Sequence, residues 1–241
     1  MEPIRIAMWS GPRNLSTALM RSFAERDDCA VWDEPFYAAY LAETGLDHPM
    51  RAAILEAHES DPSAVAAACC ADPPGAAPVL YQKHMTHHMV NGFPTGWTAH
   101  VRQAFLIRDP AQVAASYEVK REFPTLGDLG FESQKRLFDE EADRTGRAPP
   151  VVDSARLAAE PERVLSALCE RLGISFTKAM LSWSAGRHPS YGIWAAHWYG
   201  AVERSTGFRP QPDSRTPVSD HARRLADEAR PYYEHLARHV L

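Results

Sequence analysis

The sequence predicts an α/β fold with three layers, α/β/α, around a mostly parallel sheet of roughly five strands. Two observations lead to this prediction: short apolar runs recur along the chain, and helical patterns separate them. The expected strands cover residues 4–10, 29–36, 78–85, 103–109 and 149–154. Strands that alternate with helices require right-handed crossovers, so the strands run parallel and helices cover the sheet.

The segments between the strands carry helical patterns. From Leu15 onward apolar residues recur every four positions, and residues 37–71 predict two or three helices broken at Gly45, Pro49 and Pro62. Further helices are expected from 110 to about 121, over 131–144 (charged and exposed), over 161–173, and over about 218–240 with a kink or restart at Pro231. We interpret residues 1–241 as a single domain, with a helical insertion at about 37–75 and a C-terminal helical region at about 216–241.

Composition limits the function classes. The 241 residues are 45% hydrophobic and 24% charged, which is typical of a chain that buries a core. The net charge of −5 argues against broad nucleic-acid binding. Neither a leader pattern nor an apolar run of about 18 residues is present, so we expect a cytoplasmic protein that does not bind membranes. The four cysteines lack zinc spacing and are expected to be buried or incidental thiols.

Chemically active side chains gather at the predicted strand ends. Ligands of parallel sheets bind beyond the carboxyl ends of the strands. Four groups fall there: residues 10–17, Asp33 with Glu34, residues 83–88, and Arg108.

The first group belongs to the stretch "MWSGPRNLSTALMRSF", which runs from a strand through a turn into a helix. The start of a helix presents unpaired N–H groups, which bind anions. Arg13 adds a planar fork of donors suited to phosphate or sulfate, and Ser16 and Thr17 add two hydroxyls. The pattern G-x-x-x-x-G-K-[ST] of nucleotide triphosphatases is absent. The alternative is an ordinary turn with an outward-facing arginine.

The second group lies in "FLIRDPAQVAASY". Arg108 closes a strand, and Ser116 follows eight residues later, two turns into the next helix. A guanidinium and a hydroxyl so placed can clamp one phosphate. The alternative is an arginine paired with a local carboxylate and a serine that only packs.

Together the two stretches resemble the sulfotransferases that use 3′-phosphoadenosine-5′-phosphosulfate (PAPS). "GPRNLSTAL" is similar to their 5′-phosphosulfate loop, and "FLIRDPAQVAASY" is similar to their 3′-phosphate motif. The resemblance implies a P-loop-type sheet and PAPS as co-substrate, with no metal expected. It implies that the 5′ phosphosulfate is lined by Arg13, Asn14, Leu15, Ser16 and Thr17. It also implies that Arg108 and Ser116 bind the 3′-phosphate.

The chain departs from that family in three places. Many members have Lys in place of Arg13 and Gly in place of Leu15. An arginine does not give up its proton, so Arg13 would act by charge alone. The family's Arg-Lys-Gly-x-x-Gly loop is absent, and its nearest counterpart is "SAGRHPSYGIW", in which Arg187 would contact the nucleotide.

Two candidates for the catalytic base follow strands. Glu34 ends the acidic stretch "WDEPFY" and matches the position of a base in some bacterial and carbohydrate sulfotransferases that it resembles. His84, in "YQKHMTHHM", is the reserve candidate, because cytosolic sulfotransferases use a histidine after a comparable strand. The alternatives are a helix-capping carboxylate and a surface histidine. The histidines lack a nearby Cys or carboxylate partner, so no metal site is assigned.

The leading hypothesis is a sulfotransferase that moves a sulfuryl group from PAPS to a hydroxyl or amine of a small acceptor. One alternative is a P-loop small-molecule kinase or phosphohydrolase, which needs magnesium and normally a loop lysine. The other is a non-catalytic nucleotide-binding relative. The aromatic segment around Trp194 and Trp198 is interpreted as core, and a homo-oligomer is left open.

Overall fold

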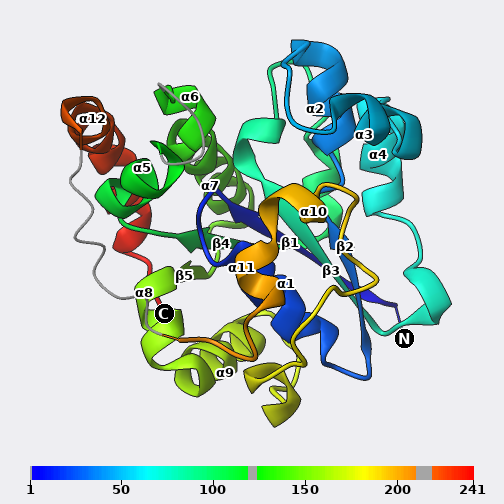
Figure 1. The fold of residues 1–241 in the computed structure, drawn as a ribbon. Helices are drawn as coiled ribbons and strands as arrows, with labels where there is room; N and C mark the ends of the chain where they lie inside the picture. The colour runs from blue at the N-terminus through cyan, green and yellow to red at the C-terminus, as the bar shows by residue number, and fades with distance from the viewer. Residues whose placement is uncertain (1, 119–123, 210–218) are drawn as a thin grey trace.

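Five parallel strands form one sheet in the computed structural model, which describes residues 2–118, 124–209 and 219–241 (Figure 1). The strands are β1 (Ile4–Ser10), β2 (Cys29–Asp33), β3 (Val79–Met85), β4 (Arg102–Ile107) and β5 (Val151–Asp153). Their order across the sheet is β2-β3-β1-β4-β5. The predicted α/β fold with its parallel sheet is confirmed. In this order β1 lies between β3 and β4, so the carboxyl end of β1 has the carboxyl ends of β3 and β4 as its neighbours.

Helices fill the intervals between the strands. They are α1 (Ser16–Ala24), α2 (Tyr37–Thr44), α3 (Arg51–Ala57), α4 (Pro62–Cys69), α5 (Pro110–Glu118), α6 (Leu126–Leu129), α7 (Phe131–Thr145), α8 (Ser154–Ala159), α9 (Pro161–Arg171), α10 (Ala195–Trp198), α11 (Gly200–Glu203) and α12 (Asp220–Ala237). The three helices predicted within 37–71 are confirmed, and Gly45 ends the first of them at φ 66°. The predicted helix end near 121 lies outside the described residues.

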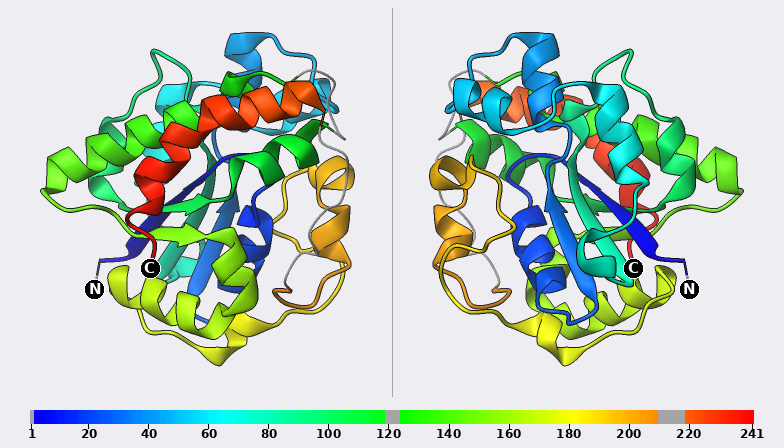
Figure 2. Two further views of the ribbon diagram at one scale, coloured as in Figure 1. Left: turned by 90° about the vertical axis from the view of Figure 1, so that its left-hand side faces the viewer. Right: turned by 90° about the vertical axis from the view of Figure 1, so that its right-hand side faces the viewer.

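Helices cover both faces of the sheet, as β1 illustrates. Successive side chains of a strand point to opposite faces. Ile6 and Met8 join a core with α1 and α9, whereas Ala7 and Trp9 join a second core with α4, α7 and α12. Figures 1 and 2 show these helices on opposite sides of the strands, and α12 (red) lies beside α5. The predicted three layers are confirmed.

Three local predictions need correction. The second strand ends at Asp33 rather than at 36, because Glu34 adopts a left-handed backbone with φ 44° and turns the chain before Pro35. The restart predicted at Pro231 is wrong, since α12 runs through this proline as one helix. Helix α7 is only partly exposed: five of its residues are buried, among them Phe138. The helix is rich in charged residues, but its apolar residues lie on one face and pack against the core. A high charge content therefore did not predict the exposure of this helix correctly.

The structure also places His84 in the core rather than at the candidate site. Lys83 and His84 are neighbours in β3 and face opposite sides of the sheet. The His84 ring lies 4.6 Å from that of Trp9 and 5.1 Å from that of Trp97, and its Nε2 is 3.0 Å from Gln82 Oε1. Burial, reinforced by the charge of Lys83, lowers the pKa of His84 to about 3. A histidine so enclosed does not reach an acceptor, so we no longer consider it a base.

The buried His84 makes stability depend on pH. Its pKa is lower in the folded chain than in the unfolded chain, so below about pH 6.5 the unfolded state binds the extra proton and folding weakens. Between about pH 6.5 and 4.5 this histidine removes roughly 1.4 kcal/mol of folding free energy per pH unit. We expect His84→Gln to reduce the pH slope of urea-unfolding free energy by that amount. The exposed His100 provides a control, since His100→Gln leaves the slope unchanged; equal slopes in all three proteins would contradict the prediction.

Candidate active site

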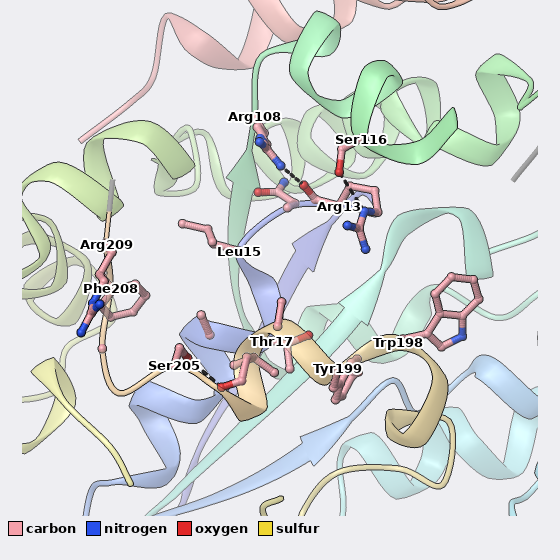
Figure 3. Close-up of a pocket in the computed structure, with 15 residues that line it drawn as sticks. Arg13, Leu15, Thr17, Arg108, Ser116, Trp198, Tyr199, Ser205, Phe208 and Arg209 are labelled. Atoms are coloured by element: carbon pink, nitrogen blue, oxygen red, sulfur yellow. Dashed lines mark hydrogen bonds between the residues drawn. The ribbon is translucent and has the colours of Figure 1, made fainter. Parts of the chain in front are cut away.

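The two predicted motifs meet at the carboxyl ends of β1 and β4. The turn Gly11–Leu15 leads from β1 into α1, and Arg108 follows β4, the neighbouring strand. Arg13 Nε donates to Ser116 Oγ at 3.0 Å, and Arg108 Nη1 donates to the carbonyl oxygen of Arg13 at 2.5 Å. Figure 3 shows Arg13, Arg108 and Ser116 gathered on one side of the turn. Residues about a hundred positions apart in the sequence therefore form one cationic cluster.

Hydrogen bonds to β4 and to the first residue of α8 anchor the turn. Asn14 Nδ2 donates to the carbonyl of Leu106 at 2.7 Å, and Asn14 Oδ1 accepts a hydrogen bond from Ser154 Oγ. Gly11 permits a close approach, because a Cβ there would lie 2.7 Å from the carbonyl oxygen of Leu129. The turn is thus held in place by protein contacts alone. Asn14, predicted as a phosphosulfate contact, serves first as this anchor.

Electrostatics at the cluster favour an anion. Burial lowers the pKa of the half-buried Arg13. Burial likewise lowers the pKa of Arg108, and repulsion from the charge of Arg13 lowers it further. Two guanidinium groups that repel each other at the start of a helix gain stability when phosphate or sulfate lies between them.

A cavity of about 300 Å³ opens beside this cluster (Figure 3). Its walls come from the turn, from α1, from the motif around Arg108, and from a C-terminal segment. The lining residues are Arg13, Asn14, Leu15, Thr17, Ala18, Arg108, Ser116, Trp198, Tyr199, Ala201, Val202, Ser205, Gly207, Phe208 and Arg209. We call this the donor cavity. Six of the residues predicted to bind the nucleotide therefore line one space; Ser16 and Arg187 are the exceptions.

The structure does not bring Arg187 to the donor cavity. Arg187 is exposed and does not line this cavity, whereas Arg209 and Phe208 do. The stretch that contains Arg187 therefore does not reach the cavity in which we expected it. "GFR" at 207–209 carries the same residue types, and only the fold shows that this segment returns to α1.

A second cavity of about 140 Å³ adjoins the first. The two share Arg13, Asn14, Thr17, Trp198 and Tyr199 as lining residues. The remaining walls are Pro12, Ser16, Glu34, Tyr37, His48, Lys83, Met85, His87, His88 and Tyr117. We call this the acceptor cavity. Arg13 therefore stands between a cationic cavity and a cavity that contains the predicted base.

Glu34 belongs to a buried network of charges. Lys83 Nζ donates to Asp33 Oδ1 at 3.1 Å, to Glu34 Oε1 and to the hydroxyl of Tyr199 at 2.9 Å. Burial raises the pKa of Glu34, and the charge of Lys83 opposes this rise. Burial would lower the pKa of Lys83, but Asp33 and Glu34 reverse this and raise it. Lys83 therefore stays charged and holds one oxygen of Glu34.

The sequence analysis missed Tyr199, Trp198 and the role of Lys83. It noted the strand that contains Lys83 and interpreted the aromatic segment as core. Both cavities nevertheless use Trp198 and Tyr199. A lysine near the end of a strand does not by itself predict a functional site. The contacts of Lys83 are with Asp33 and Glu34, which come from β2 and the turn after it.

Two further findings limit the chemistry of the described residues. They contain no group of three or more His, Cys, Asp and Glu side chains able to hold a metal ion. None of the described helices combines the length and the apolar character that a bilayer span demands.

The fold and the site define an α/β protein in which a cationic turn lies between two adjoining cavities. The chain matches the family model described as a sulfotransferase domain over residues 4–239, and it belongs to that family. The reaction class of the family is sulfuryl transfer.

Several solved structures share the fold of this chain. Mouse sulfotransferase SULT7A1, complexed with PAP, has a TM-score of 0.56 at 12% identity and covers 97% of this chain and 85% of its own. The sulfotransferase domain of the Synechococcus PCC 7002 olefin synthase has a TM-score of 0.55 at 19% identity and covers 94% of each chain. Retinol dehydratase, in complex with androsterone and the inactive cofactor PAP, has a TM-score of 0.51 at 13% identity. The match covers 97% of this chain and 81% of the retinol dehydratase chain.

Two Arabidopsis thaliana relatives are more similar in sequence. "Branched-chain-amino-acid aminotransferase-like protein 1" is 36% identical over 99% of this chain, and "protein 2" of the same name is 35% identical over 98%. The chain spans 42% of the length of each. Their names therefore describe proteins of which the matched region is less than half.

Both candidate catalytic residues adopt strained backbones. Arg13 has φ 55° and Glu34 has φ 44°, a region that favours glycine. We expect Arg13→Gly to be more stable than Arg13→Ala by about 1 kcal/mol, because both lose the side chain and only glycine relieves the strain. Chemical denaturation of the two variants measures this difference. Equal stabilities would show that the turn is not strained at Arg13.

Proposed function

We propose that this domain transfers a sulfuryl group from PAPS to a hydroxyl or amine of a small acceptor. The observation that carries the proposal is the meeting of Arg13, Arg108 and Ser116 at one cavity, next to a second cavity that contains Glu34. PAPS carries a phosphate group at the 3′ position and a phosphosulfate at the 5′ position of its ribose, and a cluster with two guanidinium groups suits a donor with two anionic groups. PAP in the complexes of two fold neighbours supports the same assignment.

In this proposal the 5′ phosphosulfate lies at the turn. Arg13 and the N–H groups that begin α1 face it, with the hydroxyls of Ser16 and Thr17 within the first helical turn. Arg108, Ser116 and Arg209 would surround the 3′-phosphate. Leu15 lines the donor cavity as an apolar wall, so the loop tolerates this departure from glycine without filling the space.

The acceptor would enter the smaller cavity and attack the sulfur in line with the departing phosphate. The new bond joins the acceptor oxygen or nitrogen to sulfur, and the bond between sulfur and the bridging phosphate oxygen breaks. The charge that develops on that oxygen would be stabilised by Arg13, which cannot donate its proton. The acceptor's proton would pass to Glu34, whose pKa burial raises toward the working pH of a base.

Calorimetry with PAP and 5′-AMP tests the donor assignment. We expect PAP to bind more tightly, and Arg108→Ala to weaken PAP by roughly 10- to 100-fold while changing 5′-AMP little, since charged hydrogen bonds contribute about 1.5–3 kcal/mol. Arg187→Ala is the matched control, because Arg187 lies outside the cavity, and it leaves both affinities unchanged. Equal affinities for PAP and 5′-AMP in the unmodified protein would exclude the 3′-phosphate clamp.

Glu34→Gln tests the base. Removing a general base lowers turnover by roughly 10²- to 10⁴-fold, and the donor affinity stays within about twofold because Glu34 lies in the acceptor cavity alone. The measurement is transfer of labelled sulfate from PAPS to a panel of phenols, alcohols and amines. In the unmodified enzyme turnover falls as pH drops, because protonated Glu34 cannot accept a proton. A protein that binds PAP and turns over nothing in either form would instead be a non-catalytic relative.

A further inference from the structure

Tyr199 lies at the wall between the two cavities. It connects α10 and α11 in the segment that passes over α1 and lines both spaces (Figure 3). Its side chain is only 5% exposed. A single residue therefore touches the donor cavity, the acceptor cavity and the network around Glu34.

The hydroxyl of Tyr199 is fully committed as an acceptor of hydrogen bonds. It accepts from Lys83 Nζ at 2.9 Å and from Trp194 Nε1 at 3.1 Å, which occupies both of its lone pairs. Its own proton can then go only to a carboxylate. Asp33 Oδ1 lies at 2.8 Å, Asp33 Oδ2 at 2.9 Å and Glu34 Oε1 at 3.1 Å, so the hydroxyl bridges the two carboxylates.

The hydroxyl remains a donor under all working conditions. Burial raises the pKa of Tyr199 well above its usual range, and the charges of Asp33 and Glu34 raise it further. Lys83 cannot replace it, because Asp33, Glu34 and Tyr199 already take its three N–H groups. Tyr199 thus supplies the carboxylate pair with a hydrogen bond in addition to those from Lys83 and from the Gly192 N–H, which donates to Asp33 Oδ2 at 3.1 Å.

We propose that Tyr199 is a positioning residue for sulfuryl transfer, whose hydroxyl fixes the Glu34 carboxylate at the boundary of the two cavities. The proposal rests on the proposed role of Glu34 as base. Lys83 Nζ and the Tyr199 hydroxyl both contact Oε1, and in this proposal the second oxygen of Glu34 takes the proton of the acceptor. The same tyrosine lines the donor cavity, so the base is held by the segment that covers the donor.

Several titratable groups surround Glu34 and set its charge together. Asp33 and Tyr37 come from the chain around β2, Lys83 from β3, and Tyr199 from the covering segment. The other titratable residues that line the acceptor cavity are Arg13, His48, His87, His88 and Tyr117. Among these, the hydroxyl of Tyr199 can be removed without altering a formal charge.

Tyr199→Phe tests the proposal. The ring remains as part of both walls, so PAP affinity stays within about twofold. Loss of a hydrogen bond to the ionised carboxylate raises the pKa of Glu34 and moves the acid limb of the kcat profile up by about one pH unit. At pH values on the acid limb, below the Glu34 pKa of both proteins, kcat falls about tenfold. A role in folding alone would lower stability and leave the acid limb where it is.

Tyr191→Phe is the matched control. The Tyr191 ring lies 5.2 Å from that of Tyr199, and its buried hydroxyl has no hydrogen-bond partner among the described residues. The same chemical change at this neighbouring ring leaves kcat and the acid limb unaltered. A shift as large as that of Tyr199→Phe would overturn the proposal, since it would reflect general loosening of the segment.

Two measurements separate this proposal from the assignment of the base. If Tyr199 acts through Glu34, Tyr199→Phe has no further effect on kcat in a Glu34→Gln background; an equal loss in both backgrounds overturns the proposal. Titration of ¹³C-labelled Glu34 by NMR needs no turnover, and a Glu34 pKa that does not rise in Tyr199→Phe overturns it as well. Full activity of Glu34→Gln would instead reject Glu34 as base, while the titration still reports whether Tyr199 holds it.

Discussion

Repulsion between the guanidinium groups of Arg13 and Arg108 is the constraint around which the site is arranged. Parallel strands bring these groups to adjacent ends, and the fold forces them together before any ligand arrives. The Arg108 guanidinium donates to the backbone carbonyl of Arg13, and the Arg13 guanidinium donates to the hydroxyl of Ser116. These two hydrogen bonds keep both guanidinium groups in place. Two like charges held this close favour an anion between them.

The turn that carries Arg13 is prepared in advance. Asn14 is fixed by Leu106 and Ser154, and Gly11 packs under the carbonyl of Leu129. Such anchoring explains how Arg13 keeps a left-handed backbone that a free chain would leave. Preorganised groups stabilise developing charge without rearrangement at the moment of reaction.

On the opposite side of the turn, Lys83 plays an indirect part. It neutralises Asp33 and Glu34 in a buried setting where a lone carboxylate would be costly. The network still leaves Glu34 at the acceptor cavity with a raised pKa. The proposed base and the buried ion pairs therefore involve the same three side chains, and Tyr199 connects them to the donor cavity.

Much of the fold could be read from local patterns. All five strands, the turn after β1 and the helices broken at Gly45 and Pro62 follow from runs of apolar residues and from glycine and proline chemistry. The two motifs that contain Arg13 and Arg108 were predicted at strand ends, and they lie together because parallel strand ends meet at one edge. Residues 192–209 escaped prediction, since a segment without periodicity gives no indication of the surface it covers.

The sequence by itself determined the strand-and-helix order, the anion-binding turn and the candidate base Glu34, because each depends on neighbours within a few positions. Tertiary structure decided which side chain of the pair Lys83 and His84 enters the site. Strand geometry requires opposite faces, but only the packing of Trp9 and Trp97 selects the face for His84. Tertiary structure also placed Arg209 rather than Arg187 in the wall of the donor cavity and Tyr199 between the two cavities. Contacts between segments far apart in the chain leave no pattern in the local sequence from which these positions could be predicted.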